Sequence, residues 1–233
     1  MRNWWVAALA AFAFLTCRAA DNPRTITDEQ WTDDLRQLAT AVKEVHFKPF
    51  HILSEDDFDA AIKRLESEIA QLSEPEIVVR MAQIVASLGD GHTRLHIPRL
   101  YPELALRAEL GHSGTPAPRH DSLKFRQSPV RFELFSDGLF VVGARPQYRD
   151  LISRKVLIMD ETPVDDAIHR VRAVSFFEND SRARLMAPDR LALPDVTNAL
   201  GISASSDVMR LTTADDAGQK LTTALSTVDK PGH

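Results

Sequence analysis

Cysteine is almost absent from this chain, since Cys17 is the only cysteine among its 233 residues. Cys17 falls within a leader that we expect to be removed, so the mature chain should have neither disulfides nor thiolate-bound metals. A domain without such cross-links depends on its hydrophobic core, and about 210 residues are enough to bury one. The sequence therefore predicts one large domain or two small ones.

A long hydrophobic run is missing as well. The apolar run Trp4–Leu15 is about a dozen residues, whereas a membrane-spanning helix needs roughly 20. Arg2 precedes the run and Ala19-Ala20 follows it, which is the layout of a secretory signal peptide. We therefore expect residues 1–20 to direct export to the periplasm or the exterior, with no stable membrane span. A lipid anchor on Cys17 is the alternative.

An excess of positive charge is also lacking. The chain has 28 Lys and Arg against 33 Asp and Glu, a net charge of −5. Removal of Arg2 and Arg18 with the leader leaves 26 basic residues and a net charge of −7. Binding to nucleic acid needs clustered Lys and Arg, so nucleic-acid partners are not expected. No cofactor is predicted, and the oligomeric state stays open.

The first third of the mature chain has the pattern of three amphipathic helices. Thr27 with Gln30, Ser54 with Asp57, and Ser73 with Glu76 are typical helix starts. Each start precedes apolar residues at spacings of three and four, which predicts a buried stripe. Short connections between these helices predict a small helical bundle over residues 21–97.

The remainder alternates between strand and helix signals. Residues 98–128 contain four prolines and no sustained periodicity, so we expect a surface linker. After the third helix we expect a short strand at 94–98 and, beyond the linker, a hairpin at 129–144 and a buried strand at 155–159 that is followed by a helix. Residues 181–200 should form short helical pieces, because Pro188 and Pro194 break them. The last expected element is a hairpin at 208–225.

The most specific motif is Gly89-Asp90-Gly91-His92-Thr93, between the third helix and the segment after it. The two glycines allow positive φ angles and a tight turn that presents the histidine. Such a histidine can act as a general base near neutral pH, with Asp90 or Thr93 available to fix its tautomer. A simple helix cap with a surface histidine is the alternative.

Here the chain resembles the C-terminal-processing, or tail-specific, serine proteases, especially their tricorn-like and retinoid-binding-protein-like relatives. In these proteins a helical bundle ends in Gly-Asp-Gly-His-Thr, which residues 89–93 match at every position. The hairpin of 129–142 and the segments around 148–167 resemble the PDZ-like module of the family. The resemblance implies an α+β fold: an N-terminal three-helix bundle, then a β-hairpin and a PDZ-like α/β module over residues 129–200. It also implies that His92 is the general base, supported by Asp90 and Thr93, and that the substrate is a peptide or protein.

Two departures from the family limit this expectation. The nucleophilic serine and oxyanion-hole glycines of the family lie in a later core, of which residues 201–233 would be only an incomplete start. Ser203, Ser205 and Ser206 lack the flanking glycines of a nucleophile turn, and a general base without a nucleophile cannot transfer an acyl group. The loop 151–154, which corresponds to the carboxylate-binding loop of a PDZ domain, contains no glycine.

Three interpretations therefore stay open. The first is the non-nucleophilic N-terminal part of an exported serine peptidase, inactive alone, either truncated or a fragment of a longer reading frame. The second is a stand-alone PDZ-like module that binds peptides or a partner without catalysis. The third is a poorly folding domain whose last hairpin leaves a sheet edge uncovered. A metal site is not expected, because His92 and His96 on a strand would be about 13 Å apart and His46 and His51 have no carboxylate at a metalloprotease spacing.

Overall fold

The computed structural model describes residues 24–95, 97, 125–174 and 180–228. The predicted signal peptide, Cys17, His96 and most of the predicted linker lie outside these residues. Within the described part of the chain, no helix is both long enough and apolar enough to cross a membrane.

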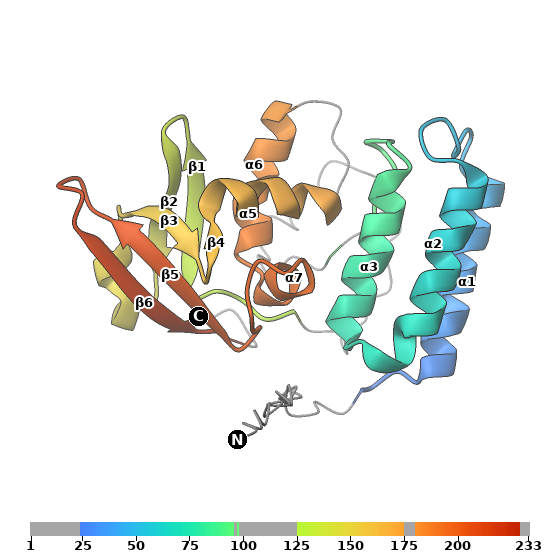
Figure 1. Ribbon diagram of the computed structural model, residues 1–233, viewed down its shortest axis with the longest axis horizontal. Coiled ribbons are helices and arrows are strands. Elements are labelled where there is room, and N and C mark those ends of the chain that lie inside the picture. The colour runs from blue at the N-terminus through green and yellow to red at the C-terminus, as the bar shows by residue number, and fades with distance from the viewer. Residues whose placement is uncertain (1–23, 96, 98–124, 175–179, 229–233) are drawn as a thin grey trace, which may run out of the picture.

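Three helices form one layer of the molecule (Figure 1). They are α1 (Asp28–Val45), α2 (Glu55–Glu68) with the short 3-10 turn η1 (Ile69–Gln71), and α3 (Glu74–Ser87). Their starts confirm the predicted caps, because the side chains of Thr27, Ser54 and Ser73 each accept a hydrogen bond from the backbone N–H three residues later. Each bond satisfies one N–H that the first turn of a helix leaves unpaired.

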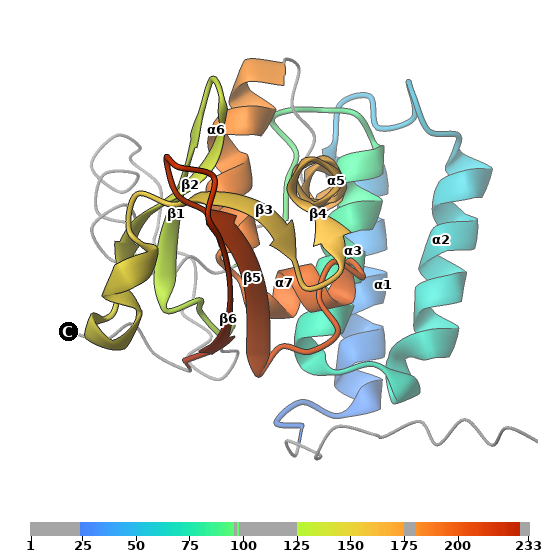
Figure 2. The same cartoon turned by 60° about the vertical axis from the view of Figure 1, so that its left-hand side comes forward.

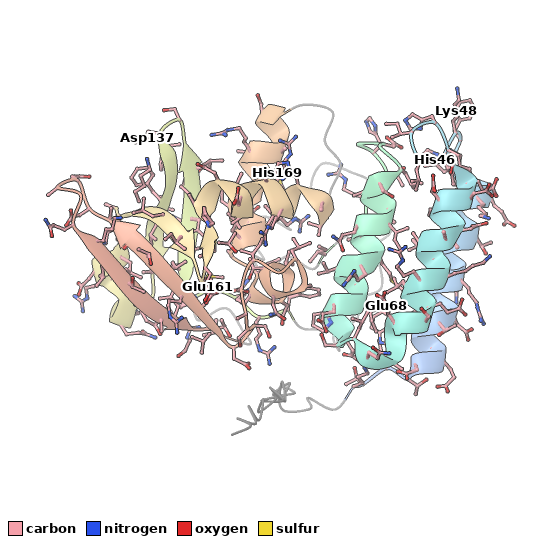
Figure 3. The ribbon with its side chains drawn as sticks, viewed as in Figure 1. His46, Lys48, Glu68, Asp137, Glu161 and His169 are labelled. Carbon is pink, nitrogen blue, oxygen red and sulfur yellow. The ribbon has the colours of Figure 1, made fainter. Side chains whose placement is uncertain are left out.

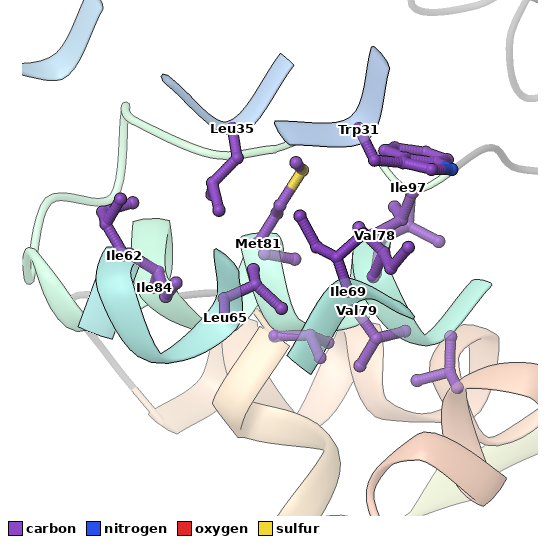
Figure 4. Packing of buried hydrophobic residues seen from close by; sticks show 14 of the residues in the cluster. Trp31, Leu35, Ile62, Leu65, Ile69, Val78, Val79, Met81, Ile84 and Ile97 are labelled. Carbon is purple, nitrogen blue, oxygen red and sulfur yellow. The ribbon is translucent and has the colours of Figure 1, made fainter. Parts of the chain in front are cut away.

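The core of this layer consists of the predicted apolar stripes (Figure 4). Leu35 of α1, Phe58 of α2 and Ile77 of α3 are fully buried, and the burial of each such side chain stabilises the fold by roughly 1.5–3 kcal/mol. On its other side α3 contacts α7 and η3, so the helical layer is joined to the rest of the molecule by packing.

The second half is built on a six-stranded antiparallel sheet of order β1-β2-β3-β5-β6, with β4 paired to β3. The strands are β1 (Val130–Phe135), β2 (Gly138–Ala144), β3 (Lys155–Met159), β4 (Thr162–Pro163), β5 (Val208–Ala214) and β6 (Lys220–Ser226). Both predicted hairpins and the predicted strand at 155–159 are confirmed.

Short helices lie between the sheet and the helical layer (Figure 2). They are α5 (Val164–Arg170), η3 (Val171–Val174), α6 (Asp180–Leu191) and α7 (Pro194–Ala199), while η2 (Pro146–Leu151) connects β2 to β3. A second core lies between them and the sheet, and includes Phe132, Val156 and Leu191. Helix α6 packs along β1, the edge strand at one side of the sheet.

The fold is mixed helix and antiparallel sheet, as the α+β expectation requires. Strand β5 pairs with β3, so one sheet contains strands from both sides of residue 200, where the predicted PDZ-like module ends. The segment before β1 also meets the segment after β6, since Gln127 and Val228 exchange two backbone hydrogen bonds of 2.8 and 2.9 Å.

Two local predictions were wrong. The described residues of the predicted strand at 94–98 have no strand structure; instead Leu95 and Ile97 pack against the helical core, and no described strand pairs with them. Pro188 does not break α6, which continues through it. The proline removes one backbone donor, but Ala183, Ala187 and Leu191 are buried on the same helix, and this packing outweighs the loss.

Candidate functional site

The candidate site is the turn of residues 89–93, which begins where α3 ends. Gly89 has a φ of 74°, the left-handed conformation in which a helix commonly ends. The conformation therefore favours glycine, and a Cβ added to Gly89 would lie 2.2 Å from Cδ1 of the exposed Ile52, so that side chain would have to move. Thr93 N–H donates to the carbonyl of Asp90 at 3.3 Å and closes the turn.

Asp90 is the residue around which the turn is organised. Its Oδ1 accepts from the backbone N–H of His92 at 2.9 Å, and its Oδ2 accepts from the Thr93 hydroxyl at 2.7 Å. His46 Nε2 lies 2.9 Å from the same Oδ2. The His92 N–H, followed by the Thr93 hydroxyl and the His46 imidazole, holds the pKa of the Asp90 carboxyl well below its usual range. Asp90 is therefore a carboxylate at neutral pH.

His92 is displayed on the surface of the turn. Its side chain is 88% exposed, and its Nδ1 lies 3.5 Å from Oδ1 of Asp90. Asp90 and Thr93 were the two residues expected to fix the tautomer of His92. Asp90 lies beside the ring, whereas the Thr93 hydroxyl donates to Asp90.

His46 is a member of this group to which the sequence assigned no role. It caps the C-terminal end of α1, and only 14% of its side chain is exposed. Figure 3 shows His46 and Lys48 in the loop at the end of the helical layer. The first and third helices of an up-down-up bundle end on the same side, and this was the signal that could have brought His46 and Asp90 together.

The other histidines do not add metal ligands to the site. His51 Nδ1 lies 3.2 Å from the backbone carbonyl of Lys48. Across the described residues, which exclude His96, there is no group of three His, Cys, Asp or Glu side chains that could hold a metal ion. The pair of His46 and Asp90 is a hydrogen bond between an imidazole and a carboxylate.

Apolar side chains are exposed beside the turn. Phe47 is 100% exposed, and Val45 and Ile52 are also exposed. We call these three residues the apical patch. Ile52 contacts the turn at Gly89, so the apical patch and His92 belong to the same end of the helical layer. Clusters of exposed apolar side chains mark surfaces at which proteins bind other molecules.

A second feature is a pocket of about 460 Å³ in the other half of the molecule. It lies between the β1–β2 turn, α5 and α6, and Figure 3 labels two of the residues that line it, Asp137 at the turn and His169 on α5. The lining residues are Leu134, Ser136, Asp137, Gly138, Asp165, Ile168, His169, Arg172, Ala183 and Arg184. The lining therefore combines side chains of both charges with apolar groups.

The fold resembles that of CPAF. CPAF is a chlamydial serine protease similar to the tail-specific proteases. Mature CPAF in complex with lactacystin matches with a TM-score of 0.52 at 13% identity, over 86% of this chain and 35% of that chain. Mature CPAF alone gives the same score and identity over 86% and 34%, and a CPAF mutant matches with 0.52 at 12% identity over 88% and 34%.

The likeness to CPAF concerns the fold. The chain spans about a third of the length of the CPAF chains that it matches. No known protein family and no curated protein sequence matches it. The comparisons therefore show a similarity of fold.

Within this CPAF-like fold, the three serines considered in the sequence have structural roles. Ser203 is buried and shares a 2.9 Å hydrogen bond with the hydroxyl of Thr197. Ser205 Oγ accepts from the backbone N–H of Asp207 at 3.0 Å. Ser206 Oγ accepts from the Arg126 guanidinium at 2.9 Å. These contacts stabilise the loop that leads into β5.

The loop 151–154 uses its backbone donors internally. The N–H of Ile152 donates to Arg149 at 3.1 Å, and that of Ser153 donates to Val141 at 2.8 Å. The N–H of Arg154 donates back to Leu151 at 3.1 Å. A carboxylate-binding loop needs N–H groups that point at the ligand, and these three are already engaged.

Proposed function

We propose that this chain is the non-nucleophilic part of an exported serine-type peptidase, with His92 as its general base and the sheet half as a peptide-positioning module of PDZ type. The observation that carries the proposal is the exposed His92 imidazole, held beside the Asp90 carboxylate on a turn that favours glycine, in a CPAF-like fold. The early apolar run of the sequence supports export.

The chemistry assigned to His92 is removal of a proton from a serine hydroxyl. The neutral imidazole accepts the proton, and the imidazolium that forms lies 3.5 Å from the Asp90 carboxylate. Because the pKa of Asp90 is held low, that carboxylate keeps its charge throughout and stabilises the cation. A positioned general base contributes about 10²–10⁴-fold to the rate of such a reaction.

We expect the nucleophile to come from another part of the assembled protease. Ser203, Ser205 and Ser206 are held in the loop before β5. The apical patch supports a partner surface at the His92 end, because exposed Phe47 and Ile52 would be desolvated when it docks. The matched CPAF chains are about two and a half times as long as this one.

The test uses a fluorophosphonate probe, which labels activated serines, and hydrolysis of an unstructured peptide. Both assays use two preparations. One is the 233-residue chain, and the other is the native material, which is the protein isolated from its source at its native level together with the polypeptides associated with it. We expect labelling and hydrolysis only in the native material. His92→Ala should abolish both, and His51→Ala, which alters a histidine of the same end of the molecule, should keep both.

Two outcomes would overturn the proposal. Hydrolysis that survives His92→Ala in the native material would remove the general base, and absence of labelling there would remove the serine. Turnover by the 233-residue chain that disappears in His92→Ala would place the nucleophile within this chain and refute the non-nucleophilic assignment.

The second candidate is a peptide-binding module without catalysis, and the pocket between β1, α5 and α6 favours it. Because the N–H groups of the loop 151–154 are engaged, we expect peptides to bind equally well with a free or an amidated C-terminus. Arg184→Ala should weaken binding measured by calorimetry, whereas Leu185→Ala, an exposed neighbour on α6 outside the pocket, should not. Equal effects of the two substitutions would refute the pocket as the binding site.

A further inference from the structure

His46 connects two segments that are far apart in the sequence. Its Nδ1 accepts a hydrogen bond from the backbone N–H of Lys48 at 3.1 Å, and its Nε2 lies 2.9 Å from Oδ2 of Asp90. An imidazole that accepts at Nδ1 and faces a carboxylate at Nε2 is neutral with its proton on Nε2. The end of α1 therefore donates a fixed hydrogen bond into the turn that follows α3.

We infer that His46 is a positioning residue for His92, which acts by holding the Asp90 carboxylate in the orientation that directs Oδ1 toward the Nδ1 of His92. The meaning of this role for catalysis rests on the proposed function of His92. Nothing in the spacing of the sequence assigns it, because 44 residues separate His46 from Asp90.

The division of donors between the two oxygens of Asp90 supports this role. Oδ2 takes the Thr93 hydroxyl at 2.7 Å and His46 Nε2 at 2.9 Å, while Oδ1 takes the His92 N–H and lies 3.5 Å from His92 Nδ1. Rotation of the carboxylate would break both bonds to Oδ2. Without His46, the Thr93 hydroxyl and the His92 N–H still resist this rotation, but one of the three donors is lost and the alignment of Oδ1 with His92 is weakened.

The aligned carboxylate selects one tautomer of His92. A neutral imidazole whose Nδ1 faces a carboxylate carries its proton on Nδ1, which leaves Nε2 as the basic nitrogen. A general base that acts through Nε2 needs this tautomer. An unconstrained histidine prefers the other tautomer, so the ratio of the two reports the position of Asp90 directly.

The test measures the His92 tautomer by ¹⁵N–¹H NMR of the ring nitrogens in the 233-residue chain. We expect His46→Ala to reduce the ratio of Nδ1–H to Nε2–H in His92 about fivefold, the size of a typical hydrogen-bond contribution. His46→Gln should keep the ratio, because its side-chain amide can donate to Asp90. His51→Ala is the matched control and should leave the ratio unchanged.

The inference is overturned if His46→Ala leaves the His92 ratio unchanged or if His51→Ala changes it equally. Circular dichroism and thermal unfolding of each variant establish that the fold is retained, and His46→Gln separates the loss of the hydrogen bond from loss of the side chain. The NMR measurement needs neither nucleophile nor substrate. If His46→Ala shifts the tautomer ratio but peptidase activity survives His92→Ala, only the proposed function is refuted. If His46→Ala leaves the ratio unchanged but His92→Ala abolishes the activity, only this inference is refuted.

Discussion

Substitution of Gly89 by alanine tests the turn that displays His92. The left-handed conformation, with a φ of 74°, costs a residue with a Cβ roughly 1–2 kcal/mol. Reduced entropy of the unfolded chain offsets about 0.4–1 kcal/mol of that cost. The new Cβ would also lie 2.2 Å from Cδ1 of Ile52, so Ile52 must move and lose its contact with the turn. We expect a total loss of about 1–2 kcal/mol, which is a decrease in Tm of roughly 2–8 °C for a chain of this size.

Two other glycines provide matched controls. Gly201 has a φ of 65° but nothing within 4 Å of an added Cβ, so Gly201→Ala should lose only the conformational part, about 1 kcal/mol. Gly143 does not have a positive φ, and its added Cβ would be 3.6 Å from Cβ of Arg131, an ordinary contact. Gly143→Ala should stay within about 0.5 kcal/mol of the parent protein.

Urea unfolding of the three variants, followed by circular dichroism, measures these differences. Addition of Ile52→Ala to Gly89→Ala should recover the part of the loss that comes from the contact, and the double-mutant cycle gives its size. A Gly89→Ala variant as stable as Gly143→Ala would refute the left-handed turn. Equal losses in Gly89→Ala and Gly201→Ala would refute the role of Ile52.

Two further predictions concern Asp90 and the buried Asp195. Because the folded-state pKa of Asp90 lies below its unfolded value, its contribution to stability is complete above about pH 4 and is lost as the pH falls below that value. Asp90→Asn should therefore flatten the acid side of the curve of unfolding free energy against pH, and an unchanged curve would contradict this. Asp195 is buried and accepts hydrogen bonds from the backbone N–H and the guanidinium of Arg126, so Asp195→Ala should cost about 1–3 kcal/mol. Asp207→Ala removes the exposed partner of the same Arg126 and should cost less than about 1 kcal/mol; equal losses in urea unfolding would show that burial of Asp195 is not decisive.

The helices and hairpins could be predicted because their signals are local. A cap such as Ser73 with Glu76 satisfies N–H groups within one turn, and the apolar spacing that follows it determines which face is buried. The β1–β2 hairpin likewise depends on the alternation of its strands and on the turn that ends at Gly138. The turn at 89–93 belongs to the same class, since a glycine after the last helical residue already indicates a left-handed end.

Tertiary structure decided the partners of these elements. The pairing of β5 with β3, the continuation of α6 through Pro188 and the absence of a strand at the described residues of 94–98 all depend on what packs against each segment. The position of His46 beside Asp90 is of the same kind, because it requires α1 and α3 to end at the same side of the layer. The sequence by itself determined where local hydrogen bonds begin and end, since those bonds join residues within a few positions. Contacts between distant segments exist only after the chain has packed, and for this reason only the folded structure added His46 to the turn that holds Asp90 and His92.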